Sequence, residues 1–121
     1  MPLPRIPDAD GRAAVRTVWA GDADRATTAL AVRWLLQELS RIAPGKSVEV
    51  RVPPFGAVQI VEGPGHTRGT PPNVIETDAS TIVALAVGTE SWVDAVARGA
   101  VLASGTRATL QDLLPLHGLS E

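Results

Sequence analysis

The sequence predicts an α+β fold in which helices gather over one face of a mainly antiparallel, five-stranded sheet. Apolar residues recur at helical spacing over residues 25–43, and from Ser47 onward they alternate with polar residues as a half-buried strand requires. From residue 25 the predicted elements follow in the order helix, two strands, loop, strand, two helices and two strands. Strands and helices in this order are typical of an α+β domain.

The longest predicted helix covers residues 25–43. Asp22 or Asp24 offers a carboxylate to its amino end, and the Pro44-Gly45 pair ends it. At about 100° per residue, five apolar side chains share one broad stripe, namely Val32, Leu35, Leu36, Leu39 and Ile42. This stripe is the pattern of a helix laid on a sheet.

A shorter helix is predicted within residues 1–21, an amino-terminal extension of a single domain that covers residues 1–121. The length of 121 residues favours one domain, because domains are usually about 100 to 150 residues long. The proline-rich start of the chain is expected to be extended. Asp8 or Asp10 then caps the short helix, and Gly21 follows its end.

Leu30 and Trp34 lie on the side of the long helix opposite the apolar stripe, so another element must cover them. One interpretation is that the short helix lies there and contacts them through Val18 and Trp19. The alternative is that they form a dimer contact or the mouth of a ligand site.

Valine alternates with charged residues at positions 48–52, which predicts a half-buried strand. A second strand at residues 57–62 follows a proline-rich turn, so the two strands are expected to form an antiparallel hairpin. The glycine- and proline-rich stretch at residues 63–72 predicts a loop. Residues 73–77 then predict a third strand.

Asp78 is placed to cap a buried apolar helix at residues 79–87. A further short helix is predicted at residues 90–98, followed by a fourth strand at residues 100–104. From Arg107 the pattern predicts a fifth strand or its remnant.

Composition and charge exclude several classes of partner. Eleven basic and thirteen acidic residues give a formal charge of −2 without a basic cluster, so nucleic acid is not an expected partner. No apolar run approaches the roughly 18 residues of a membrane span, and the start of the chain lacks a signal segment. The absence of cysteine excludes disulfides and cysteine-ligated zinc. A cytoplasmic location is therefore predicted.

Few residues suggest chemistry. His66 and His117 have no ligand-type neighbours at metal-binding spacing, so neither a metal nor a cofactor is predicted. Residues 63–72 lack the lysine and the glycine spacing of a phosphate-binding loop. They are interpreted either as a solvated hairpin loop or as a contact for an acidic head group through His66 and Arg68. With no activated nucleophile and no paired carboxylates, an enzyme is not predicted.

Two stretches of the second half resemble a known family. Residues 73–88, NVIETDASTIVALAVG, are similar to the strand, capping acid and apolar helix of the sterol carrier protein 2 family, and residues 95–105, AVARGAVLASG, to its short helix, strand and closing glycine. Over roughly residues 25–115 the chain resembles the compact, single-domain actinobacterial branch. The resemblance implies five strands with helices on one face, and a hydrophobic cavity that accepts fatty acyl chains, acyl-CoA or sterols.

We therefore expect a non-catalytic domain that binds or carries an apolar ligand between helices and sheet. Small alanines scattered among aliphatic residues predict a modest cavity there. Its expected lining is Leu35, Leu39, Val50, Ile60, Ile82, Leu85, Trp92, Val96 and Leu102. The alternative is a protein interaction or accessory module with a filled core and no ligand, and a homodimer is possible in either case.

Overall fold

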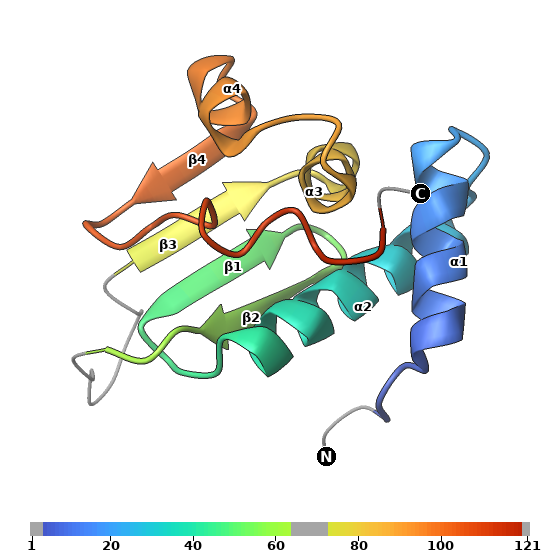
Figure 1. Ribbon diagram of the computed structural model, residues 1–121, viewed down its shortest axis with the longest axis horizontal. Helices are drawn as coiled ribbons and strands as arrows, with labels where there is room; N and C mark the ends of the chain where they lie inside the picture. The colour runs from blue at the N-terminus through green and yellow to red at the C-terminus, as the bar shows by residue number, and fades with distance from the viewer. Residues whose placement is uncertain (1–3, 64–72, 120–121) are drawn as a thin grey trace.

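The computed structural model describes residues 4–63 and 73–119. In that part of the chain it contains four helices and four strands (Figure 1). The helices are α1 (Asp8–Trp19), α2 (Arg25–Ile42), α3 (Ala79–Val87) and α4 (Trp92–Ala97). The strands are β1 (Val48–Val52), β2 (Gly56–Ile60), β3 (Asn73–Thr77) and β4 (Val101–Ser104). The class is α+β, as the sequence predicts.

The strands form one open, mixed sheet in the order β2-β1-β3-β4. β1 and β2 form the predicted antiparallel hairpin, and β3 and β4 are also antiparallel, but β1 and β3 run parallel. In this register Val50 lies opposite both Val58 and Ile75. β3 starts at the same end of the sheet as β1, which makes their pairing parallel. The sheet is therefore mixed rather than mainly antiparallel, with β2 and β4 at its edges.

The fifth strand predicted from Arg107 does not form in the described residues. Gly105, with a φ of 107°, turns the chain away from β4. The Arg107 backbone N–H then donates to the side-chain Oδ1 of the buried Asn73 at 2.9 Å, so it is not available to a strand partner. Beyond it, Leu110 is buried in the core, and a turn follows. A side-chain acceptor from β3 thus replaces the predicted strand pairing.

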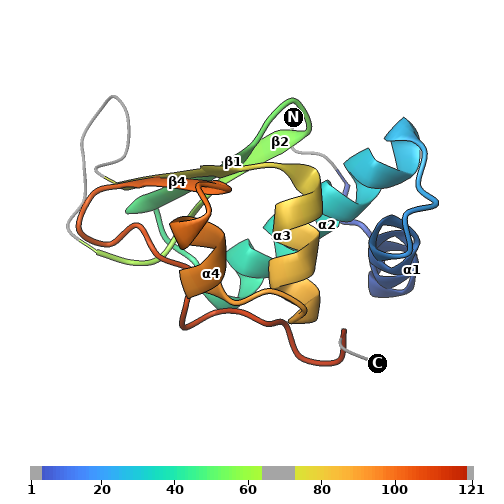
Figure 2. The ribbon, with the colours of Figure 1, turned by 90° about the horizontal axis from the view of Figure 1, so that it is seen from above.

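The helices lie on one side of the sheet, as predicted, and Figure 2 shows the sheet edge-on with α2, α3 and α4 below it. The valines of β1 point toward them and are fully buried, as the alternating pattern indicates. Glu49 and Arg51 lie on the other face, where they form an ion pair at 3.0 Å. The single hydrophobic core therefore lies between the sheet and the helices.

Most helix boundaries follow the predicted capping signals. Asp24 accepts from the Thr27 N–H at the start of α2, and Asp78 accepts from the Thr81 N–H at the start of α3, each at 2.8 Å. The predicted short helix forms as α1, but its predicted cap by Asp8 or Asp10 is wrong, because the residue before the helix is Pro7, which makes no side-chain cap. Asp8 is instead the first residue of α1.

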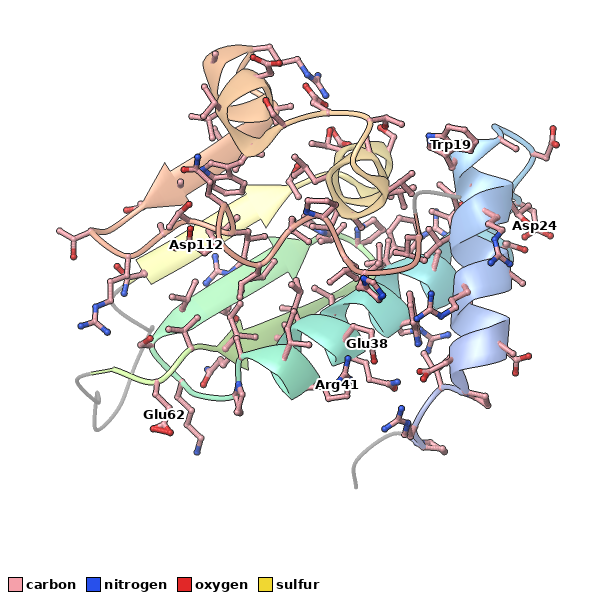
Figure 3. All side chains as sticks on the ribbon, viewed as in Figure 1. Trp19, Asp24, Glu38, Arg41, Glu62 and Asp112 are labelled. Carbon is pink, nitrogen blue, oxygen red and sulfur yellow. The ribbon has the colours of Figure 1, made fainter. Side chains whose placement is uncertain are left out.

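Asp8 is used to hold α1 against α2. Its Oδ1 accepts a hydrogen bond of 3.1 Å from Nε1 of Trp34, a residue of α2 that is only 1% exposed. Gly11 packs directly on the indole ring of Trp34. The prediction that the amino-terminal helix covers Trp34 is thus confirmed, although the contacts come from Asp8 and Gly11. Trp19 lies at the carboxyl end of α1 (Figure 3) and is 55% exposed.

The contact between α1 and α2 predicts an unusual response to Gly11→Ala. In an exposed helix this change stabilises by about 1 kcal/mol. Here the added Cβ overlaps the Trp34 ring, so we expect a loss of about 1 to 3 kcal/mol from overpacking. Urea unfolding followed by circular dichroism measures it. Ala13→Leu, on the exposed side of the same helix, is the control and should change little. Stabilisation by Gly11→Ala would contradict the close packing.

The Asp8–Trp34 hydrogen bond also predicts a pH dependence of stability. It holds the pKa of Asp8 below its ordinary value, with the Arg5 guanidinium acting in the same direction. A carboxyl group whose pKa is lowered by folding stabilises the fold above its unfolded pKa of about 4, and this stabilisation is lost as the pH falls through the lower folded value. Asp8→Asn and Trp34→Phe should each flatten the acid limb of a melting temperature against pH curve. Curves parallel to the wild type would contradict this.

Candidate functional site

A surface groove of about 510 Å³ lies where the segment before α1, the helix α2 and the start of β2 meet. Its volume falls in the range of roughly 300 to 1,000 Å³ that is usual for small-molecule sites. We call it the α2–β2 groove. It is lined by Pro4, Arg5, Ile6, Pro7, Asp10, Leu30, Arg33, Leu36, Gln37, Phe55, Gly56, Ala57 and Val58. Most of these side chains are apolar, and the few polar ones allow orientation of a ligand.

One wall of the groove is the extended segment before α1, and Gln37 holds it in place. The Ile6 N–H donates to Gln37 Oε1 at 2.8 Å, and Gln37 Nε2 donates to the Ile6 carbonyl at 3.0 Å. The side-chain amide therefore satisfies both backbone groups of Ile6, as a neighbouring strand would. The prolines on both sides of Arg5 and Ile6 favour the extended conformation that this pairing requires.

The other walls come from α2 and from the hairpin between β1 and β2. Leu30 and Leu36 belong to α2, where Leu36 is buried and Leu30 is half-buried. Gly56 allows the start of β2 to approach Leu36, because a Cβ at this position would lie 3.3 Å from Leu36 Cδ1. Phe55 is half-buried at the hairpin, and the Arg25 guanidinium carbon lies 5.7 Å from the centre of its ring.

Six of the nine side chains predicted to line an interior cavity lie together in the core. These are Leu35, Leu39, Val50, Ile60, Ile82 and Leu85, and each is no more than 2% exposed. Of the six, Leu85 also borders a surface hollow of about 250 Å³, which it shares with Trp92 near α4. The α2–β2 groove lies at a different place, on the outer side of α2 and at the edge of the sheet.

Of the other three predicted residues, Trp92 is partly buried and packs against that core, whereas Val96 and Leu102 lie apart from it. Val96, on α4, is 40% exposed. Leu102 is 66% exposed and lies opposite Glu76 in the register of β3 and β4, whereas the buried Val101 lies opposite Thr77. Because side chains alternate along a strand, Leu102 points to the face of the sheet that carries no helix. Its prediction as a cavity residue is therefore wrong.

Polar candidates are sparse in the described residues. His66 and Arg68, the predicted head-group contacts, lie outside them. His117 is exposed and borders a hollow together with Arg41 and Glu38. Glu38 is buried but accepts from Arg41 at 2.9 Å, and both side chains project from the same side of α2 (Figure 3). Residues 4–63 and 73–119 contain no group of three or more potential metal ligands, and none of their helices could cross a membrane.

The groove residues were mostly missed by sequence reasoning, although one signal pointed to them. Leu30 does not belong to the apolar stripe of α2. From the sequence, its position outside the stripe is interpreted either as a contact with the short helix or as part of a dimer contact or the mouth of a ligand site. The structure separates Leu30 from Trp34: α1 covers Trp34, while Leu30 borders the groove. Ile6 and Phe55 carry no periodic signal, because they lie in segments outside helices and strands.

The protein is therefore a small α+β domain that carries a mostly apolar groove on its surface. The sequence matches the family described as bacterial SCP ortholog over residues 24–116, where SCP stands for sterol carrier protein, and the chain belongs to this family. No curated protein sequence matches the chain. The matched region includes α2, all four strands, α3 and α4. The segment before α1 lies outside the matched region, so the family domain supplies only part of the groove.

The Gln37 contact predicts that Gln37→Ala releases the wall of the groove. Two hydrogen bonds of about 1 kcal/mol each are lost, so trypsin should cut the Arg5–Ile6 bond about thirtyfold faster. Mass spectrometry of a digestion time course measures the cleavage. Gln59→Ala, on the opposite face of the sheet, is the matched control. Equal cleavage rates in Gln37→Ala and the wild type would show that the amide does not hold this segment.

Proposed function

We propose that this protein is a non-catalytic domain that binds an apolar, lipid-like ligand, and that the ligand lies in the α2–β2 groove. Membership of the sterol carrier protein family supports the ligand class. The apolar groove, with its few polar groups at the margin, supports the place. The ligand would be a fatty acyl chain, an acyl-CoA or a sterol-like lipid, and the protein would hold it, in the cytoplasm, without changing it.

The groove suits an alkyl chain on energetic grounds. Burying one CH₂ group contributes about 0.8 kcal/mol, so six of them contribute about 5 kcal/mol before the entropy of association is subtracted. A chain of this kind would contact Ile6 on one side and Leu30 and Leu36 on the other. Gln37 already holds the backbone of Ile6 at one wall, and Leu36 at the other wall is buried in the core, so little ordering is needed on binding.

A second candidate function is a protein interaction module without a ligand. The dense packing of the predicted cavity residues favours it. So does the exposure of large apolar side chains in the second half of the chain, at Val93, Val96 and Leu102. Native mass spectrometry of protein purified from a bacterial host separates the two functions, since co-purified lipid supports the first and an empty dimer supports the second.

Binding of a neutral probe tests the proposed site. Parinaryl alcohol, a slender polyene alcohol, becomes fluorescent when it leaves water. We expect it to bind the wild type, and Leu30→Glu to weaken binding by about tenfold or more, because a carboxylate would replace an apolar wall. A fluorescence titration measures both affinities. Glutamate is a good helix former, so α2 should persist in the far-UV circular dichroism spectrum.

The matched control is Leu102→Glu, which places the same charge on the exposed face of the sheet. It should bind the alcohol as the wild type does. Equal affinities of Leu30→Glu and the wild type, or an equal loss in Leu102→Glu, would refute the groove as the site. Failure of the wild type to bind any alkyl probe would refute the ligand-binding function itself.

A further inference from the structure

A second hollow, also of about 510 Å³, adjoins the α2–β2 groove. Its lining is Arg25, Ala26, Ala29, Arg33, Pro54 and Phe55. Arg33 and Phe55 belong to both hollows, so a ligand that follows the groove past Phe55 reaches this second space. The two hollows differ in chemistry: the first is mostly apolar, whereas the second contains two arginines and no carboxylate.

The two arginines of the second hollow are available to a ligand. Arg25 lies over the ring of Phe55, and Arg33 donates from Nε to the carbonyl of Ala29 at 3.4 Å. The ion pairs of the described residues involve Arg5, Arg41, Arg51 and Arg98. Neither Arg25 nor Arg33 takes part in an ion pair there, although the chain as a whole carries a formal charge of −2. Each therefore has guanidinium N–H groups free for an anion.

The charged residues of the α2–β2 groove indicate which end of an amphiphilic ligand would lie in each hollow. Asp10 borders the α2–β2 groove but not the second hollow. Arg5, which borders the same groove, is paired with Asp8 at 3.3 Å. An anionic group would be repelled near Asp10 and attracted near Arg25 and Arg33. An amphiphile with a negative head should consequently lie with its tail in the groove and its head beyond Phe55.

We propose that Arg25 and Arg33 form an anion subsite, and that the ligand of the groove is a single-chain amphiphile whose terminal carboxylate binds there. This inference rests on the proposed function, because the tail needs the groove. It goes further in naming the head group and the residues that select it. Arg33 is the arginine that borders both hollows, and Arg25 lies over the ring of Phe55.

The test compares parinaric acid with parinaryl alcohol, which share one tail and differ only in the head group. Two charge-assisted hydrogen bonds partly exposed to water should make the wild type prefer the acid by about tenfold at neutral pH and low salt. Arg25→Gln combined with Arg33→Gln should reduce the ratio of the two affinities to about one. Because the ratio is taken within each variant, a change in the shape of the groove affects both probes alike.

Two further variants sharpen the result. Arg33→Lys, with Arg25 intact, should keep a reduced preference because the charge remains while the planar fork is lost. Arg16→Gln removes a cation from α1 that borders a different hollow, beside Trp19, and should keep the full preference. An acid preference that survives in the double variant would overturn the anion subsite, while binding of the alcohol would still support the proposed function. Failure of both probes to bind would overturn the two together.

Discussion

The position of the segment before α1, which is one wall of the groove, depends on the contact between Trp34 and α1. Trp34 points away from the sheet. Gly11 covers its indole ring, and the indole N–H donates a hydrogen bond to Asp8. Only a glycine allows the two helices to come so close, because any Cβ at position 11 would overlap the ring. The contact fixes where α1 begins, and therefore where the chain that precedes it can run. That chain passes along α2 at Gln37 and becomes a wall of the groove.

The groove therefore combines residues inside the family match with a segment that lies outside it. The family match starts at residue 24, so α2 and β2 lie within it, whereas Ile6 and its neighbours lie outside it. Without that segment, the side of α2 that carries Leu30 would be an open apolar strip beside the edge strand β2. An apolar strip next to an unpaired strand edge favours self-association. The extended segment gives this strip a second wall, so that it becomes the floor of a groove.

Local patterns predicted most of the elements, whereas contacts between distant residues decided what was missed. The caps of α2 and α3 and the alternation in β1 depend on neighbours in sequence and were found. The missing fifth strand depends on Asn73, whose side chain takes the Arg107 N–H across 34 positions. The face of Leu102 depends on the register with β3, and the groove depends on Gln37 meeting Ile6. The periodicity of apolar residues in the sequence indicates none of these contacts, so they could not be predicted from it.

The alanines of the interior explain why the predicted cavity and the groove lie in different places. A small side chain leaves a void only if its surroundings stay where a larger one would hold them. Ala31, Ala86 and Ala95 are instead almost fully buried, so their neighbours have closed around them. Small residues thus bring the helices nearer to one another and to the sheet rather than making room between them. The room remains at the margin, in the groove between α2, the edge strand β2 and the segment before α1. The proposed ligand would enter there without opening the core, so the fold would keep its packing whether the groove is filled or empty.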